Sequence, residues 1–365
     1  MKILDKYIFK QVLAAVLIWM LMSVVVLMAP EILFRIIRDT IYDRITLETA
    51  LRLFLLEIPE ILSKAIPVGF MLGSLYVFDR MSKDSELTII RSVGIKTRRL
   101  FVPVIVLSIV GAFICNILFN NLIPYTTSTV KNLRKDVAQS HFIYTDKYPS
   151  GAPKNILIVG SYSNGHIYEI KYLAFSETES MGTPMIKSII VAYWAEAKKD
   201  HWLLHNGFEY TISPKGIYEE TKSFEKMKIF DEKTSRQAKD LLVYSTKRPK
   251  EMTVPELHNY MNLLHENEME GQKQFIVGKI YQRSALSLGC ILFAICGVLL
   301  GFNRPREKRF IGYTLGVGLI FIYYIILPFL DLLAQAGTFP AFFIAWIPNL
   351  IIITAIGLLI KFKEI

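Results

Sequence analysis

The fold of this chain is decided by an uncharged run near its beginning, which reads VLAAVLIWMLMSVVVLMAP over residues 12–30. A helix needs about 20 mostly apolar residues to cross a bilayer, and this run is long enough. It superficially resembles a secretory signal peptide. However, it is longer than the usual apolar region of such a peptide, and no small-x-small cleavage site follows it. We therefore expect a membrane span that is retained in the protein.

Five more segments along the chain have the same apolar character. The second span is unusual because Glu57, Glu60 and Lys64 lie in its first half, where Pro59 and Pro67 are able to kink a helix. These charges either lie at the membrane interface, with side chains that extend toward water, or face a polar cavity. The six expected spans are about 10–33, about 48–79, Leu100–Ile123, Ser284–Phe302, Phe310–Leu330 and about 341–360.

The composition agrees with a membrane protein in which apolar and charged residues are segregated along the chain. Of 365 residues, 52% are hydrophobic and 20% are charged, with a formal net charge of +10. A basic balance fits nucleic acid, a membrane surface or an acidic ligand, so the positions of the charges must decide. The three cysteines, Cys115, Cys290 and Cys296, lie in apolar runs and have neither a disulfide framework nor metal-ligand spacing.

Short basic loops predict the orientation, because lysine and arginine in such loops stay on the cytoplasmic side. Both chain ends and the short loops at residues 80–99 and 304–309 are rich in these residues. Six spans with both termini in the cytoplasm place all four on that side. The chain is then a multi-pass protein of the inner membrane, and its long polar insert lies in the periplasm of a Gram-negative cell.

The short outer loop after the first span opposes this charge rule. It carries several arginines, which two aspartates offset only in part. Either these arginines lie at the interface and pair with the aspartates or ordinary lipid phosphates, or they form a cationic ring for a strongly anionic substrate. The planar guanidinium group donates two parallel hydrogen bonds to a phosphate, which favours such a ring. The candidate phosphate-binding residues are Arg35, Arg38, Arg44 and Arg52.

The polar insert contains short β-branched and aromatic runs separated by turn signals, which predict an all-β sandwich or roll. The turn signals are Asn164-Gly165, Asn206-Gly207 and Lys215-Gly216. Such a domain could carry a lipid tail along an apolar groove, dock a periplasmic protein at an open strand edge, or act as an inert cap. The expected strands are Asn155–Val159, His166–Phe175, Met185–Ala197, His201–Leu204, Phe208–Ile212 and Ser223–Ile229.

An acidic helix is expected after the strands, because Thr253 and Glu256 have capping-box spacing. It runs to about Glu270, either at the membrane surface or packed on the β domain. Although His201 and His205 are four residues apart, they lie in a strand–turn sequence rather than on a helix face. No zinc site, catalytic set or other metal site is therefore expected.

The cytoplasmic loop between the second and third spans predicts a short amphipathic helix over about 84–94. Asp84 or Ser85 is suited to its N-cap, and Gly94 to a left-handed end. Its apolar stripe, Leu87, Ile90 and Val93, has little of its own chain to bury against. The helix is therefore expected to meet a partner protein or to lie on the lipid surface. The sequence has no G-x-x-x-x-G-K-[ST] phosphate loop, so a pump would need a separate ATPase.

Taken together, these sequence features are similar to those of a known family. The chain resembles the lipopolysaccharide export permeases LptF and LptG over nearly its whole length. The strongest local match is the run from Ser85-Glu86-Leu87 to Ser92-Val93-Gly94, which resembles the family's coupling helix. One departure lies at Val298–Pro305, where the family often has a Pro-Leu-Gly-like turn. Further matches are Leu4–Ile8, Pro59-Glu60, Pro67, Tyr323-Tyr324 and Ala345–Asn349.

The resemblance implies an integral membrane α-helical fold, with six transmembrane helices and an inserted periplasmic all-β jellyroll-like domain. The corresponding boundaries are 1–123, 124–270 and 271–365. It also implies a permease subunit of an ABC transporter, which extracts lipopolysaccharide from the inner membrane and passes it to a periplasmic bridge. The implied partners are a dimeric LptB-like ATPase, a second LptF/LptG-type permease, and LptC-like and LptA-like jellyroll proteins.

The resemblance also assigns expected roles to residues. Glu86 matches the family's acidic contact with the ATPase, and Arg35 and Arg38 fall where the family carries basic residues near the substrate phosphates. Arg44 and Arg52 extend that set from the charge pattern alone. No cofactor, enzyme activity or nucleic-acid partner is expected, because ATP binds to the partner subunit. The full expected ATPase-coupling set is Ser85, Glu86, Leu87, Ile90, Arg91 and Gly94.

Two other functions stay open from the residues. The chain could be the permease of another ATP-driven lipid or lipoprotein exporter. It could also be a non-transporting membrane scaffold with a periplasmic binding module. The sequence does not distinguish an F-like from a G-like member, or a homodimer from a heterodimer.

Overall fold

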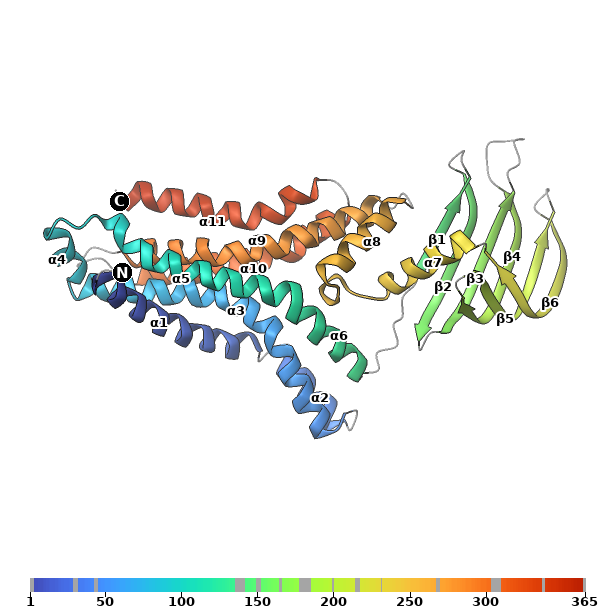
Figure 1. Cartoon of the computed structure of the whole chain (residues 1–365), viewed down its shortest axis with the longest axis horizontal. Helices are drawn as coiled ribbons and strands as arrows, with labels where there is room; N and C mark the ends of the chain where they lie inside the picture. Colours follow the sequence, from blue (N-terminus) through green and yellow to red (C-terminus); the bar gives the residue numbers. More distant parts are fainter. Residues whose placement is uncertain are drawn as a thin grey trace. The chain divides into compact units, whose positions relative to one another are not determined.

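The computed structural model describes the chain from Ile3 to Lys363 apart from residues 29–31, 43–44, 135–141, 149–151, 164–165, 177–184, 199, 214–216, 231, 267–269, 303–309 and 337–338 (Figure 1). The chain divides into two compact units. The membrane unit consists of Met1–Arg134, Pro249–Leu257 and Glu270–Ile365. The β unit consists of Lys135–Arg248 and His258–Met269.

Among the residues that the structure describes, six helices are long and apolar enough to cross a membrane, which confirms the expected spans. Their ends differ from the expected ones. The third span continues through a π-helical turn to Lys131, and the fourth helix begins at Glu270 rather than Ser284. The elements are α1 (Ile3–Met28), α2 (Phe34–Ile41), α3 (Leu47–Lys83), α4 (Glu86–Ser92), α5 (Thr97–Ile117), η2 (Leu118–Leu122), α6 (Ile123–Arg134), η3 (Pro249–Glu251), α9 (Glu270–Gly301), α10 (Phe310–Gln335) and α11 (Ala341–Lys363).

Helix α3 contacts both α1 and α9, and glycines allow the backbones to approach closely. A Cβ atom at Gly73 of α3 would lie 2.7 Å from the Cα atom of Val16 in α1. A Cβ atom at Gly297 of α9 would lie 2.2 Å from the carbonyl oxygen of Met71 in α3. Small residues at such points are typical of packed membrane helices. Helices α1, α3 and α9 therefore form a tightly packed centre.

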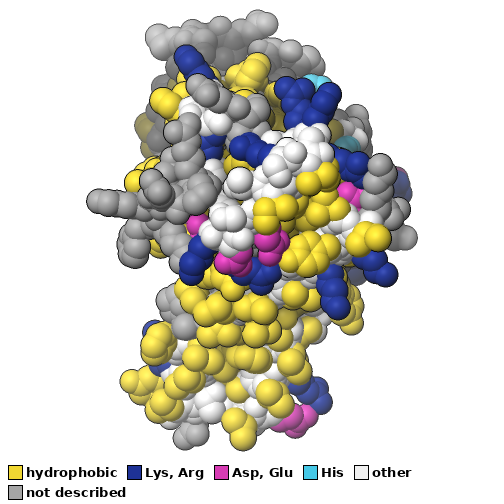
Figure 2. Space-filling model, turned by 90° about the vertical axis from the view of Figure 1, so that its left-hand side faces the viewer, with side chains coloured by type: hydrophobic (Ala, Val, Ile, Leu, Met, Phe, Trp, Pro, Cys, Tyr) yellow, Lys and Arg dark blue, Asp and Glu magenta, His cyan; other side chains and the backbone are white. Residues whose placement is uncertain are grey.

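The outward faces of the membrane unit are apolar. Large exposed hydrophobic side chains are frequent on α1, α10 and α11, as a lipid-facing or subunit-facing surface requires. Figure 2 shows the molecule from the side on which α4 lies in Figure 1. In this view, charged side chains gather above a broad hydrophobic surface. The three cysteines are free and buried, and the sulfur atoms of Cys115 and Cys290 lie 3.5 Å apart.

The β unit is built on one six-stranded sheet, which confirms the inserted all-β domain. Each strand pairs antiparallel with the next one in the sequence, in the order β1-β2-β3-β4-β5-β6. The inward side chains Leu157, Ile170 and Leu204 are fully buried, as alternation along the strands requires. The strands are β1 (Phe142–Lys147), β2 (Pro153–Ser163), β3 (His166–Ser176), β4 (Met185–Ala197), β5 (Trp202–Ile212) and β6 (Tyr218–Ile229).

The predicted turn at Asn206-Gly207 was wrong, because a single strand, β5, runs through it. Asn206 has a φ of 52°, and Gly207 pairs with Ala192 on β4 and Phe224 on β6. The left-handed residue is absorbed as a local irregularity in the strand rather than closing a hairpin. Strand β1 was not predicted. The other two turn signals include residues outside the described chain.

Helix α7 (Glu232–Ser245) belongs to the β unit, whereas α8 (Val254–Glu266) begins in the membrane unit and is assigned to the β unit from His258 onward. The indole nitrogen of the buried Trp202 donates to the carbonyl oxygen of Ser235, 3.3 Å away, and so ties α7 to β5. At the start of α8, the backbone nitrogen of Thr253 donates to Glu256 Oε2 at 2.8 Å, as the capping-box spacing predicts. His205 stacks on Trp194 at 3.8 Å between ring centroids.

Candidate functional site

The predicted outer arginines are placed by α2 and by the beginning of α3. Arg35 and Arg38 are three residues apart on α2 and thus share one helix face. A buried apolar cluster that includes Ile36 of α2 and Leu53 of α3 holds the two helices together. Arg52 lies in the second turn of α3, and Arg44 lies outside the described residues.

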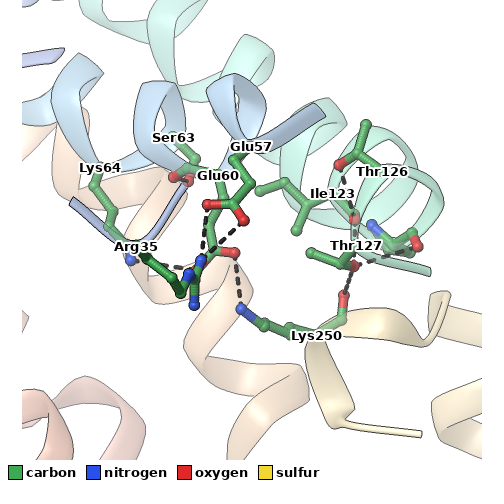
Figure 3. A network of polar contacts seen from close by, with 10 residues as sticks. Arg35, Glu57, Glu60, Ser63, Lys64, Ile123, Thr126, Thr127 and Lys250 are labelled. Carbon is green, nitrogen blue, oxygen red and sulfur yellow. Dashed lines mark hydrogen bonds and ion pairs between the residues drawn. The ribbon is translucent and has the colours of Figure 1, made fainter. Parts of the chain in front are cut away.

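Arg35 is bound to Glu57 of α3 (Figure 3). Its Nη2 atom lies 2.9 Å from Glu57 Oε1 and 3.0 Å from Oε2, so one donor serves both carboxylate oxygens. Glu57 is only 9% exposed, whereas the Arg35 side chain is about half-buried. The buried Nε atom of Arg35 has no partner among the described residues.

The other two described arginines differ from Arg35. Arg38 is exposed, and the described chain gives its guanidinium group no ion-pair partner. Arg52 pairs with Glu48 one turn earlier, at 2.6 Å, with both side chains mostly in solvent. An exposed pair of this kind contributes little stability and is readily broken. The structure thus brings Arg35 and Arg38 together and places Arg52 in a separate, screened pair.

The other charges of the second span are paired with a distant part of the chain. Glu60 accepts hydrogen bonds from Lys250 at 2.9 Å and from Lys64 at 3.4 Å (Figure 3). Thr127 of α6 donates to the backbone carbonyl oxygen of Lys250 at 3.4 Å. The sequence analysis predicted either charges at the membrane interface or charges that face a polar cavity, and neither alternative included this network. Helix α3 nevertheless continues through both of its prolines.

The segment around Lys250 is held by side chains of α3, α6 and α9, and the contact with α3 is the pair of Lys250 and Glu60 described above. Lys131 of α6 lies 3.4 Å from Glu251 Oε2. The buried Arg283 of α9 donates to the carbonyl oxygens of Pro249, at 2.8 Å, and Met252, at 2.7 Å. The sequence could not place Lys250 here, because it lies 190 residues after its partner Glu60.

Helix α4 forms where the coupling helix was expected, and Gly94 has the predicted left-handed conformation with a φ of 84°. Ser85 precedes the helix, but its side chain makes no capping hydrogen bond. Its φ is 57°, which is left-handed rather than the extended conformation of most N-caps.

The apolar stripe of α4 is divided between the protein interior and the surface. Leu87 is 3% exposed within the main core cluster, and Ile90 packs against that cluster. The expectation that the stripe has little of its own chain to bury against was therefore wrong for Leu87 and Ile90. Two apolar side chains do remain outside, since Ile89 is 61% and Val93 is 74% exposed.

Polar contacts connect α4 to three other parts of the membrane unit. Glu86 accepts a hydrogen bond from the hydroxyl of Tyr7 in α1, with both carboxylate oxygens at 3.2 Å. Arg91 donates to Thr97 at 3.2 Å, and its guanidinium carbon lies 4.6 Å from the centre of the Phe302 ring. Sequence reasoning missed Tyr7 and Phe302, which no local signal marks as neighbours of α4.

Helices α10 and α11 are joined to the rest by polar contacts inside the bundle. The Tyr323 hydroxyl donates to Asn349 Oδ1 at 3.0 Å, and Asn349 Nδ2 donates to the carbonyl oxygen of Ala285 in α9 at 2.8 Å. Tyr324 donates to the carbonyl oxygen of Lys64 at 2.7 Å. These matched motif residues therefore connect α3, α9, α10 and α11.

Six candidate spans, an inserted β domain and a short helix between two spans define a multi-pass membrane protein. A comparison with curated proteins found no match. The chain belongs to the family described as lipopolysaccharide export system permease LptF/LptG, whose family model matches residues 6–361. This match confirms the resemblance, and it covers both the spans and the β unit. The family is one of transport permeases.

Proposed function

We propose that this chain is the permease subunit of an ABC transporter that extracts lipopolysaccharide from the inner membrane. A separate dimeric, LptB-like ATPase binds and hydrolyses the ATP, and the chain itself needs no cofactor. A second LptF/LptG-type permease completes the cavity. Both termini and α4 lie in the cytoplasm, and the β unit lies in the periplasm. The family match over residues 6–361 is the observation that carries this proposal.

The ATPase docks on α4 in this proposal. A helix of seven residues is marginal alone, yet Leu87 and Ile90 secure it to the bundle. Ile89 and Val93 are left exposed and supply apolar surface that a docked ATPase would cover. Motion of the ATPase would reach the spans through this rigid attachment.

The substrate phosphates bind at Arg35 and Arg38 in this proposal, and the acyl chains lie against the apolar helix faces. The β unit accepts the lipid and continues into LptC-like and LptA-like jellyroll proteins. The two strands at the ends of the described sheet, β1 and β6, are the candidate sites for strand addition.

Affinity purification in mild detergent tests this function. Mass spectrometry of the co-purified proteins should identify a nucleotide hydrolase and a second permease, and lipid analysis should identify phosphorylated glycolipid. Recovery of the folded protein with neither a nucleotide hydrolase nor such a lipid would refute the proposal. Labelling of introduced surface cysteines in intact cells tests the orientation, because the β unit should be accessible from the periplasm.

A further inference from the structure

The ion pair between Arg35 and Glu57 occupies one of the two α2 arginines that are proposed to bind a substrate phosphate. Both oxygens of Glu57 lie within 3.0 Å of one guanidinium nitrogen. A phosphate and a carboxylate bind a guanidinium group in the same way, through its planar set of N–H donors. A phosphate that takes this nitrogen must therefore displace the Glu57 carboxylate.

The displacement is unfavourable because of where Glu57 lies. The carboxylate is 9% exposed, so it gains little water when it loses the guanidinium group. Breaking a buried ion pair is costly, because water replaces the lost guanidinium contact only in part, whichever other contacts Glu57 keeps. The pair thus weakens capture of an anionic headgroup at Arg35 and favours its release.

We propose that Glu57 is an internal competitor for the substrate phosphate, which keeps phosphate binding at Arg35 reversible. The inference rests on the proposed export function and deepens it. A transporter must release its cargo as well as bind it, and a permanent phosphate–arginine pair would oppose release. Glu57 is then a positioning residue, which acts on the substrate through Arg35.

The surroundings allow this exchange without unfolding. Helix α2 is held on α3 by the apolar cluster around Ile36 and Leu53, so only side chains have to move. Arg38 shares the helix face of Arg35 and is exposed, which suits it to the first contact with a phosphate. The phosphate can then move on to the guanidinium group of Arg35 as Glu57 leaves.

The pair of Arg52 and Glu48 is the matched control within the same chain. It joins the same residue types at a similar distance, 2.6 Å, but both side chains are mostly in solvent. Water compensates the carboxylate when this pair opens, so Glu48 should be a weak competitor.

The test measures binding of lipopolysaccharide to the full-length protein in detergent, together with any subunits that co-purify. Two probes are compared: lipopolysaccharide with its lipid phosphates intact, and the same material after dephosphorylation. The variants are Glu57→Gln, Glu57→Asp, Glu48→Gln and Arg35→Gln, with the double variant Arg35→Gln/Glu57→Gln. Each is first checked for wild-type elution on size exclusion.

We expect Glu57→Gln to bind the phosphorylated probe about tenfold more tightly, which corresponds to about 1.4 kcal/mol, and to release it more slowly. Glu57→Asp, whose carboxylate is one methylene shorter, should change affinity in the same direction by a smaller factor. Glu48→Gln should stay within about twofold of wild type. In the Arg35→Gln background, the Glu57 substitution should have no further effect.

Two results overturn the inference in different ways. If the wild type prefers the phosphorylated probe, but both Glu57 variants bind it with wild-type affinity, Glu57 does not compete and the export function is untouched. If the wild type binds both probes equally, phosphate recognition itself is refuted and the inference fails with it.

Discussion

Replacement of Leu87 by alanine should release α4 from the bundle. Leu87 is buried in the main core cluster, and a Leu→Ala change in a packed core costs about 2–5 kcal/mol. Even the lower value shifts the equilibrium between docked and undocked α4 about 30-fold. Since α4 has seven residues, it has no independent stability with which to resist this change. Limited proteolysis of the purified protein should then cleave the loop at residues 80–99 faster than in the wild type.

The matched control is Val93→Ser on the same helix. Val93 is mostly in solvent, so this change should leave both the proteolysis rate and the melting temperature close to wild type. It should nevertheless weaken association with the ATPase, which size-exclusion chromatography of the mixed proteins measures. The reasoning fails if Leu87→Ala is cleaved no faster than wild type, or if Val93→Ser destabilises the protein as much as Leu87→Ala.

Three further predictions, two of them with a matched control, concern other contacts of the membrane unit. Glu86→Lys should abolish the coupling of ATP hydrolysis to export in reconstituted vesicles. Tyr7→Phe, which removes only an internal hydrogen bond, should leave export near wild type. Gly297→Val should prevent recovery of folded protein on size exclusion, because its Cβ would overlap the backbone of α3; Gly318→Ala, in open space, should be recovered normally. Asn349→Ala should lower thermal stability by about 1–3 kcal/mol, since it leaves the buried Tyr323 hydroxyl without its acceptor and removes the side-chain donor to the Ala285 carbonyl oxygen. Unchanged melting would contradict that role for the asparagine.

The spans were predictable because membrane crossing depends on local composition. The ends of the spans were less predictable. Polar residues such as Glu270 continue a helix beyond the apolar stretch, since intrahelical hydrogen bonds do not depend on hydropathy. The left-handed residue at Gly94 was also predictable from local chemistry. In contrast, Asn206-Gly207 resembles a hairpin turn but lies within β5, where pairing on both sides overrides the local preference.

The candidate site was predictable only in part. Charge pattern and family resemblance selected Arg35, but nothing local indicated that Glu57 would be its partner rather than a charge at the interface. The contact between Glu60 and Lys250 joins residues that lie before and after the six described strands in the sequence, a separation that no periodicity or spacing signal covers. The burial of Leu87 likewise depends on a core assembled from several helices.

The glycine contacts of α3 have a consequence for how this subunit can work. At Gly73 the backbone of α3 lies close to α1, and at Gly297 the backbone of α9 lies close to α3. If either neighbouring helix slid along α3, a residue with a side chain would replace the glycine at the contact and would overlap the backbone opposite. These contacts hold α1, from the first half of the bundle, and α9, from the second half, closely against α3. In the proposed exporter, a cavity for a bulky lipid would therefore change its width at the contact with a second permease rather than by separation of α1, α3 and α9.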